Sequence, residues 1–153
     1  VRLYWDQAVY KKPGTKDEFP WHQDNGYTFI EPQAYLTCWV ALTDTDETNG
    51  CPCVVPGLHK RGTLHHENTE LGYQIPLDSS ESITLPLKAG SIAIFSSLTP
   101  HRTGPNLSEG IRKSYILQYA PEGSKRLVSD SISEEVNDET RQFLILRDGK
   151  RVN

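Results

Sequence analysis

Two neighbouring residues near the start of the chain, His22 and Asp24, have the types and spacing of metal ligands. In His22-Gln23-Asp24 an imidazole and a carboxylate stand at positions i and i+2. On an extended chain such side chains project from the same face, whereas Gln23 and Asn25 point to the other. A His-x-Asp pair is common by chance, so a metal site requires a third ligand from elsewhere in the chain.

His101 is the strongest candidate for that third ligand. It follows the apolar, strand-like run Gly90–Phe95 closely. Two neutral imidazoles and one carboxylate on one side of an ion leave its opposite positions open, and this arrangement suits the oxygen chemistry of Fe(II). His22, Asp24 and His101 are therefore predicted to bind a metal ion, with iron as the expected metal.

Arg112 lies eleven positions after His101 (112 − 101 = 11) and opens the apolar run Tyr115–Tyr119. On a strand it shares a face with Ser114. A guanidinium that points into a β-barrel is costly unless it meets an anion, and its two parallel donors match a carboxylate. A dicarboxylate that chelates iron at one end and pairs with Arg112 at the other satisfies both demands. The alternative is a solvated surface arginine or one paired with an acid at the rim.

The elements that must position these residues are predicted to be strands. Helical periodicity is nearly absent before residue 120, whereas short runs rich in Val, Ile, Tyr and Thr alternate with turn residues. About eight strands at this spacing indicate an all-β sandwich, barrel or jelly roll with few helices. The expected strands are Arg2–Lys11, Trp21–Asp24, Ala34–Leu42, Cys53–Val55, Tyr73–Leu77, Ile83–Leu87, Ser91–Phe95 and Lys113–Tyr119.

The chain is predicted to consist of a catalytic core over residues 1–120 and a tail over residues 121–153. The tail is rich in Ser, Asp and Glu, so we expect a short helix from about Asp138 or partial disorder. Residues 59–72 are expected to form a long surface loop. Because the chain starts directly in a strand-like run, we expect it to be a fragment of a longer protein.

Composition narrows the classes of partner and compartment. The chain has 153 residues and a formal charge of −4, which argues against a nucleic-acid partner. No apolar run approaches the ~20 residues of a membrane span. Three cysteines form a sparse, odd set, which favours a reducing compartment and predicts a cytoplasmic location. The expected partner is a small-molecule substrate, and the composition does not predict an oligomeric state.

Four stretches resemble the phytanoyl-CoA dioxygenase-like family of Fe(II)/2-oxoglutarate-dependent oxygenases. Leu58 stands where the family's Pro-Gly-Ser-His pattern has a small residue. The likeness covers about residues 1–120 in order, and it implies a double-stranded β-helix. Family members usually carry an N-terminal helical segment before this core, and we expect this chain to lack it. The four stretches are Trp21–Tyr27, Leu36–Leu42 with Asn49-Gly50-Cys51, Val54–Lys60 and Gly90–Tyr119.

The resemblance also implies roles for individual residues. His22, Asp24 and His101 would ligate Fe(II), and Arg112 would hold the distal carboxylate of 2-oxoglutarate, which reacts with O2 to give succinate and CO2. Halogenating relatives replace the carboxylate ligand with a small residue, so the presence of Asp24 favours hydroxylation. Further co-substrate contacts are expected from Thr103, Ser114, Lys11 and Trp39, although a slip of one residue would exchange Lys11 for Lys12, and Trp39 could equally belong to the core.

Gln7 shares a strand face with Lys11, and Gln7 and Tyr27 are expected to line the substrate pocket. Cys51-Pro52-Cys53 lacks a second pair of soft ligands, so a zinc site is not expected there. Two other functional classes stay open at this level. One is a jelly-roll binding module with an inactive metal site, and the other is a cupin-type metal-dependent hydrolase or isomerase, which would not need Arg112.

Overall fold

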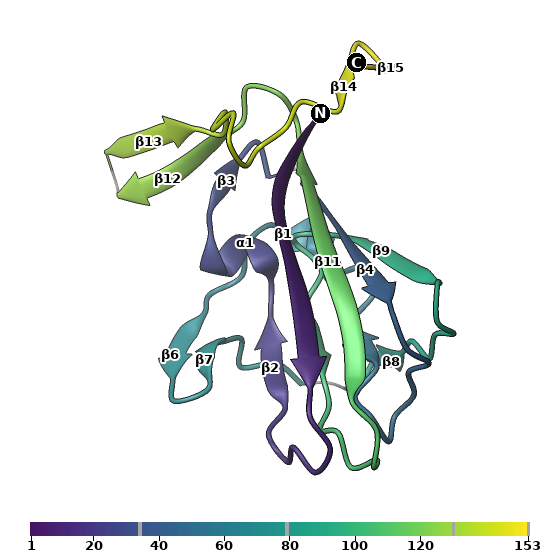
Figure 1. Cartoon of the computed structure of the whole chain (residues 1–153). Helices are drawn as coiled ribbons and strands as arrows, with labels where there is room; N and C mark the ends of the chain where they lie inside the picture. The colour runs from purple at the N-terminus through teal and green to yellow at the C-terminus, as the bar shows by residue number, and fades with distance from the viewer. Residues whose placement is uncertain (34, 79, 130, 153) are drawn as a thin grey trace.

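Two four-stranded antiparallel sheets form the body of the protein in a computed structural model that describes residues 1–33, 35–78, 80–129 and 131–152 (Figure 1). Crossovers in the strand order make the pair of sheets a jelly roll, and the predicted double-stranded β-helix is confirmed. The first sheet has the order β1 (Arg2–Lys11), β11 (Arg112–Ala120), β4 (Leu36–Ala41), β9 (Ile92–Ser96). The second has the order β2 (Phe19–His22), β10 (His101–Thr103), β5 (Pro52–Val54), β8 (Ile83–Thr84).

Shorter elements surround this body. A third, three-stranded sheet pairs the C-terminal hairpin with a short strand that follows the helical turn. The elements are α1 (Asp24–Tyr27), β3 (Ile30–Glu31), the 3-10 helix η1 (Leu58–Arg61), β6 (Glu67–Thr69), β7 (Gly72–Gln74), β12 (Lys125–Ser129), β13 (Ile132–Glu135), β14 (Leu146–Arg147) and β15 (Lys150–Arg151).

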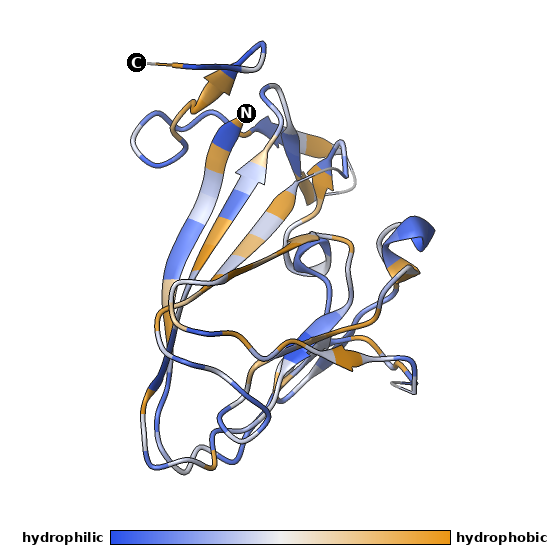
Figure 2. Cartoon of the chain, turned by 90° about the vertical axis from the view of Figure 1, so that its right-hand side faces the viewer, coloured by the Kyte–Doolittle hydropathy of each residue, from blue (hydrophilic) through white to orange (hydrophobic). Residues whose placement is uncertain are grey.

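The first sheet buries one face and exposes the other. Along β11 the buried residues alternate strictly, from Arg112 through Ser114 and Ile116 to Gln118. The ribbon in Figure 2 shows the matching alternation of hydrophobic and hydrophilic bands on these strands. Ile116 packs with Trp39 and other apolar residues in the middle of this face. The inner face is therefore apolar at its centre and polar toward both ends of β11.

The tail beyond residue 120 packs on the body of the protein. Val136 is 2% exposed and belongs to a buried cluster with Tyr4, Ile30 and Tyr35. The helix expected from about Asp138 does not form, because residues 139–141 make a turn and strands flank it on both sides. Figure 1 shows the hairpin β12–β13 next to β3, beside the N-terminal end of β1.

Other expected boundaries also differ from the structure, most of them by a few residues. The strand expected over Trp21–Asp24 ends at His22, because Asp24 begins α1. The strand expected over Ala34–Leu42 is β4, and Ala34 lies outside the described residues. Residues 59–72, expected to be a loop, include most of η1 and the hairpin strand β6. Among the described residues, no helix has the length and apolar character needed to cross a membrane.

Candidate metal centre

His22 and His101 meet because two strands of the second sheet are paired in one particular register. His22 is the last residue of β2, His101 is the first residue of β10, and the two are direct antiparallel partners. Their ring centroids are 4.1 Å apart, and the two residues are 5% and 7% exposed. Residues 79 positions apart in the sequence thus become neighbours through a backbone ladder (101 − 22 = 79).

Backbone carbonyls fix the orientation of both imidazoles. His22 Nδ1 lies 2.8 Å from Pro20 O, and His101 Nδ1 lies 2.9 Å from Thr99 O. Since a carbonyl only accepts, each Nδ1 carries the proton, which leaves each Nε2 with a free lone pair. These are the tautomers that a metal ion bound at both Nε2 atoms requires.

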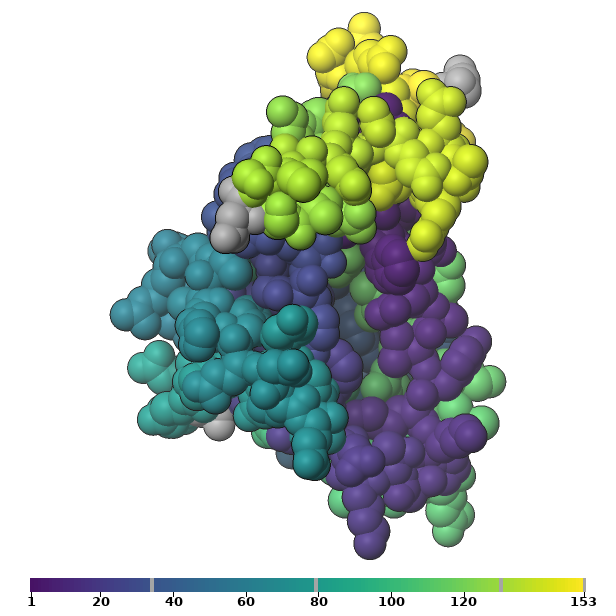
Figure 3. All heavy atoms as spheres, turned by 90° about the vertical axis from the view of Figure 1, so that its left-hand side faces the viewer, coloured from purple at the N-terminus to yellow at the C-terminus, as the bar shows by residue number. Residues whose placement is uncertain are grey.

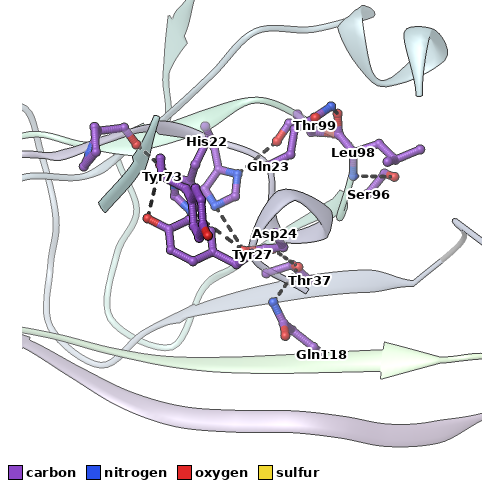
Figure 4. Close-up of polar contacts among 12 residues, drawn as sticks. His22, Gln23, Asp24, Tyr27, Thr37, Tyr73, Ser96, Leu98, Thr99 and Gln118 are labelled. Atoms are coloured by element: carbon purple, nitrogen blue, oxygen red, sulfur yellow. Dashed lines mark hydrogen bonds and ion pairs between the residues drawn. The ribbon is translucent and has the colours of Figure 1, made fainter. Parts of the chain in front are cut away.

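Asp24 completes the group and lies next to His22 in Figure 4. Gln23 is extended, with φ −112° and ψ 142°, so the alternation of side chains persists up to Asp24 although α1 begins there. Asp24 Oδ1 lies 3.8 Å from His22 Nε2 and 3.7 Å from His101 Nε2. These separations are shorter than the roughly 4 Å spanned by two metal–ligand bonds, so one ion can contact all three atoms. Two imidazoles and one carboxylate fit Fe(II).

Burial favours the neutral, metal-binding form of His22. Removal from water lowers the pKa of His22 well below its ordinary value, and the nearby His101 lowers it further. Metal binding needs a deprotonated imidazole nitrogen, so little proton competition is expected at His22 near neutral pH.

Arg112 is a buried guanidinium without an acidic partner among the described residues. It is 1% exposed, its Nη1 donates to Ser114 Oγ at 2.7 Å, and its Cζ lies 5.4 Å from the centre of the Trp39 ring. Its Nε is buried and makes no hydrogen bond within the described chain. Burial lowers the pKa of Arg112 to about 10. A charge held in this way is stabilised when an anion joins it.

Lys11 lies beside Arg112 and contacts Thr103. Lys11 is the direct partner of Arg112 in the β1–β11 ladder, and its Nζ donates to Gly104 O at 2.5 Å and to Thr103 Oγ1 at 3.4 Å. Burial, followed by the charge of Arg112, lowers the pKa of Lys11 to about 8. The neighbouring Lys12 is exposed, so the structure places Lys11 on the Arg112 side.

A cavity of about 690 Å³ opens beside the metal ligands. In Figure 3 the cavity is the hollow between β1 and the segment around α1, and the hairpin β12–β13 lies above it. His22 and Asp24 line it, as do the predicted pocket residues Gln7 and Tyr27. Trp39 and Arg112 are not among its lining residues within the described chain. Arg112, which is 1% exposed, is therefore closed off from this cavity.

The C-terminal tail contributes part of the cavity wall, which the sequence did not predict. Arg141 lies over the Trp5 ring at 5.0 Å from its centre, and Arg126 forms an ion pair with Glu134. These four residues line the cavity together with Val136. No signal in the sequence could have revealed this wall, because the tail reaches the cavity only through long-range packing on the cluster around Tyr4 and Tyr35.

Gln23 organises the loops around the ligands, a role that its position away from the ligand face did not predict. It is fully buried, and its Nε2 donates to Leu98 O at 2.5 Å and to Gly62 O at 3.0 Å, while Leu64 N donates to its Oε1. Its backbone N–H donates to His66 Nε2 at 3.0 Å. Gln23 thereby ties the segment before His101 to the segment after η1.

His66 occupies the space that a side chain at Gly26 would fill. A Cβ built on Gly26 would stand 2.1 Å from His66 Cε1. His66 Nδ1 donates to Leu64 O at 2.8 Å, so its Nε2 is the acceptor for the Gln23 N–H. Burial lowers the pKa of His66. The glycine in Asp24-Asn25-Gly26 is therefore a packing requirement next to the metal ligands.

Comparisons with known proteins give a consistent result. The family model described as phytanoyl-CoA dioxygenase matches residues 1–114. Phytanoyl-CoA dioxygenase of Arabidopsis thaliana is 31% identical over 115 residues, which cover 71% of this chain and 41% of the relative. Methylphosphonate hydroxylase of Gimesia maris is 32% identical over 118 residues, with 76% of this chain and 44% of that protein covered. The chain thus spans less than half the length of these two relatives.

Solved structures support the same fold. EvdO2 from Micromonospora carbonacea var. aurantiaca, complexed with 2-oxoglutarate, superposes with a TM-score of 0.72 at 26% identity, covering 90% of this chain and 55% of that chain. The non-haem monooxygenase ThoJ superposes with a TM-score of 0.75, also at 26% identity, over 94% of this chain and 56% of its own.

Proposed function

The chain belongs to the phytanoyl-CoA dioxygenase family, and on this premise we propose that it is the catalytic core of a non-haem Fe(II)- and 2-oxoglutarate-dependent oxygenase. The proposed reaction hydroxylates a small organic substrate and releases succinate and CO2. The observation that carries the proposal is the convergence of His22, Asp24 and His101 on one point, with Nε2 to Oδ1 distances of 3.8 and 3.7 Å.

In this proposal His22, Asp24 and His101 hold the iron through Nε2, Oδ1 and Nε2. Pro20 O and Thr99 O keep the two imidazoles in the required tautomer. When bound, the iron would supply the oxidative chemistry of the reaction. Asp24 supplies the carboxylate ligand, which favours hydroxylation over halogen transfer.

Arg112 is proposed to bind the distal carboxylate of 2-oxoglutarate. Its lack of an acidic partner in the described chain and its unpaired Nε support this role. Ser114 Oγ positions one guanidinium nitrogen, and Trp39 packs under the guanidinium. Lys11 and Thr103 are proposed to complete the pocket, because Lys11 is the ladder partner of Arg112 and its side chain contacts Thr103.

The 690 Å³ cavity is proposed as the substrate pocket. Tyr27 lies edge-on to the His22 ring at 5.4 Å, so a substrate held against Tyr27 would lie close to the metal. Gln7 offers a polar contact on the β1 side, and Arg141 offers one from the tail. Aromatic and charged residues line the same cavity, which supports a small substrate with both apolar and polar parts.

We further propose that the protein acts in the cytoplasm and has no nucleic-acid partner. The net charge of −4 supports the second point. The three cysteines, Cys38, Cys51 and Cys53, are all free, which is consistent with a reducing compartment.

Uncoupled turnover tests the proposed function without knowledge of the substrate. The purified protein, supplied with Fe(II), 2-oxoglutarate and air, should form succinate, and omission of iron or replacement Asp24→Ala should abolish it. A binding module with an inactive metal site would form no succinate, nor would a cupin-type hydrolase or isomerase. Absence of succinate from a folded, iron-loaded protein would overturn the proposal.

A further inference from the structure

The two oxygens of the Asp24 carboxylate have different surroundings. Oδ1 faces the two histidine Nε2 atoms, at 3.8 and 3.7 Å. Oδ2 points away from them and accepts a hydrogen bond from Thr37 Oγ1 at 2.5 Å. Figure 4 shows this division, with Thr37 on the far side of Asp24 from His22. The hydrogen bond holds the carboxylate with Oδ1 toward the two imidazoles, so Oδ1 is the oxygen presented to a metal.

The Thr37 hydroxyl has a defined direction. Thr37 lies on β4, is 2% exposed, and is the direct partner of Gln118 on β11. Gln118 Nε2 lies 3.5 Å from Thr37 Oγ1, at the outer limit of a hydrogen bond, and donates to it. Because an ionised carboxylate only accepts and the amide NH2 only donates, the single hydroxyl proton of Thr37 must go to Asp24. Gln118 thus donates to Thr37, and Thr37 donates to Asp24.

We propose that Thr37 is a positioning residue that holds Asp24 as a one-oxygen ligand through Oδ1, and that Gln118 acts on Asp24 through Thr37. The inference rests on the proposed function, since it assumes a metal at the His-Asp-His group. If Oδ2 were free, the carboxylate could rotate and occupy a second position on the ion. Thr37 would therefore keep Asp24 from occupying that second position.

Thr37 and Gln118 are polar residues on a sheet face whose centre is apolar. On β11 and β4 the residues between this pair and Arg112 include Ile116, Trp39 and Ala41, which are buried. A buried threonine and glutamine at this level of the ladder require hydrogen-bond partners, and Asp24 Oδ2 is the charged acceptor available. Gln118 also lines the large cavity, so the chain of hydrogen bonds runs from the substrate side to the metal ligand.

Metal binding by isosteric variants tests the proposal. Apo-protein is titrated anaerobically with Co(II), and the visible absorption of the bound ion reports both affinity and coordination. Thr37→Val removes the hydroxyl at constant shape and should weaken Co(II) binding by about 10–100-fold, the usual effect of losing an outer-shell partner, and alter the spectrum. Thr37→Ser keeps the hydroxyl and should restore both. Thr45→Val is the matched control, because Thr45 is also buried but its hydroxyl has no hydrogen-bond partner in the described chain.

A double-mutant cycle tests the part assigned to Gln118. Gln118→Leu should weaken Co(II) binding less than Thr37→Val, and the double variant should bind no more weakly than Thr37→Val alone. Additive losses would show that Gln118 acts independently. If Thr37→Val lowers only the thermal midpoint and leaves Co(II) affinity and spectrum unchanged, Thr37 is merely structural and the proposal is overturned. A wild-type protein that binds no Co(II) would instead refute the metal centre itself.

Discussion

His22 and His101 are direct antiparallel partners at the adjoining ends of β2 and β10, with their ring centroids 4.1 Å apart. This one register brings together two imidazoles whose Nδ1 atoms are already committed to backbone carbonyls. A slip of one residue in this ladder would turn one ring to the opposite face of the sheet. The metal centre therefore depends on strand pairing as much as on the identity of its ligands.

Replacement of Arg112 should weaken the binding of 2-oxoglutarate without unfolding the protein. We expect Arg112→Ala to cost about 2–5 kcal/mol of binding free energy, because a buried, hydrogen-bonded charge pair is lost. Anaerobic calorimetry on the iron-loaded protein measures this. Arg147→Ala, at an exposed arginine paired with Glu122, is the matched control and should bind as the wild type does. If the wild type, Arg112→Ala and Arg147→Ala bind 2-oxoglutarate with equal affinity, Arg112 does not bind its distal carboxylate.

Gly26→Ala should destabilise the region next to the metal ligands. The new Cβ would stand 2.1 Å from the His66 ring, so the ring must move and the acceptor for the Gln23 N–H is lost. We expect a loss of about 1–3 kcal/mol in the free energy of unfolding, measured by urea denaturation. Gly110→Ala is the control, because a Cβ there meets nothing within 4 Å. Similar stability of the two variants would contradict the packing described for His66.

Val136→Ala tests whether the tail is part of the folded unit. Val136 is 2% exposed in the cluster with Tyr4 and Tyr35, so the variant should lose about 1–3 kcal/mol of unfolding free energy. Val128→Ala makes the same chemical change at a residue that is 52% exposed, and should stay within about 0.5 kcal/mol of the wild type. A tail that does not pack on the body would give two small, equal effects.

The apo-protein should lose stability as the pH falls below about 6.5. Burial lowers the pKa of His66, so the unfolded chain binds a proton that the folded chain resists. Stability from this source is therefore present above the ordinary value of 6.5 and declines as the pH drops toward the lower, folded pKa. Thermal midpoints between pH 5 and 8 measure the slope. The buried His22 contributes to the slope in the same direction. His66→Gln, which keeps an acceptor for the Gln23 N–H, should therefore reduce the slope without abolishing it, whereas His65→Gln, at an exposed neighbour, should leave it unchanged. An unchanged slope in His66→Gln would assign the effect to other groups.

The all-β class was predictable from local patterns, which left sandwich, barrel and jelly roll open, and the strand β1 has the expected bounds Arg2–Lys11. The family resemblance supplied the choice of a double-stranded β-helix. Alternation also placed Arg112 and Ser114 on one face of β11, which the buried positions confirm. The helix expected near Asp138 is absent, since residues 139–141 form a turn between short strands.

The surroundings of the ligands could not be predicted in the same way. Thr37 and Gln118 meet through the register of β4 and β11, and His66 meets Gly26 through a loop that returns to α1. Such contacts depend on which distant strands and loops pair, and the spacing of residues in a single sequence does not reveal that pairing. The roles assigned to His22, Asp24, His101 and Arg112 stay predictions until ligand binding is measured.

Anaerobic absorption spectroscopy tests the central claim most directly. Addition of Fe(II) and 2-oxoglutarate to the apo-protein should produce a weak visible metal-to-ligand charge-transfer band, because the co-substrate chelates iron held by His22, Asp24 and His101. The band should fade when air is admitted, with the appearance of succinate. A folded protein that binds Fe(II) and 2-oxoglutarate but shows no such band, or shows it unchanged in His101→Ala, would contradict the proposed site.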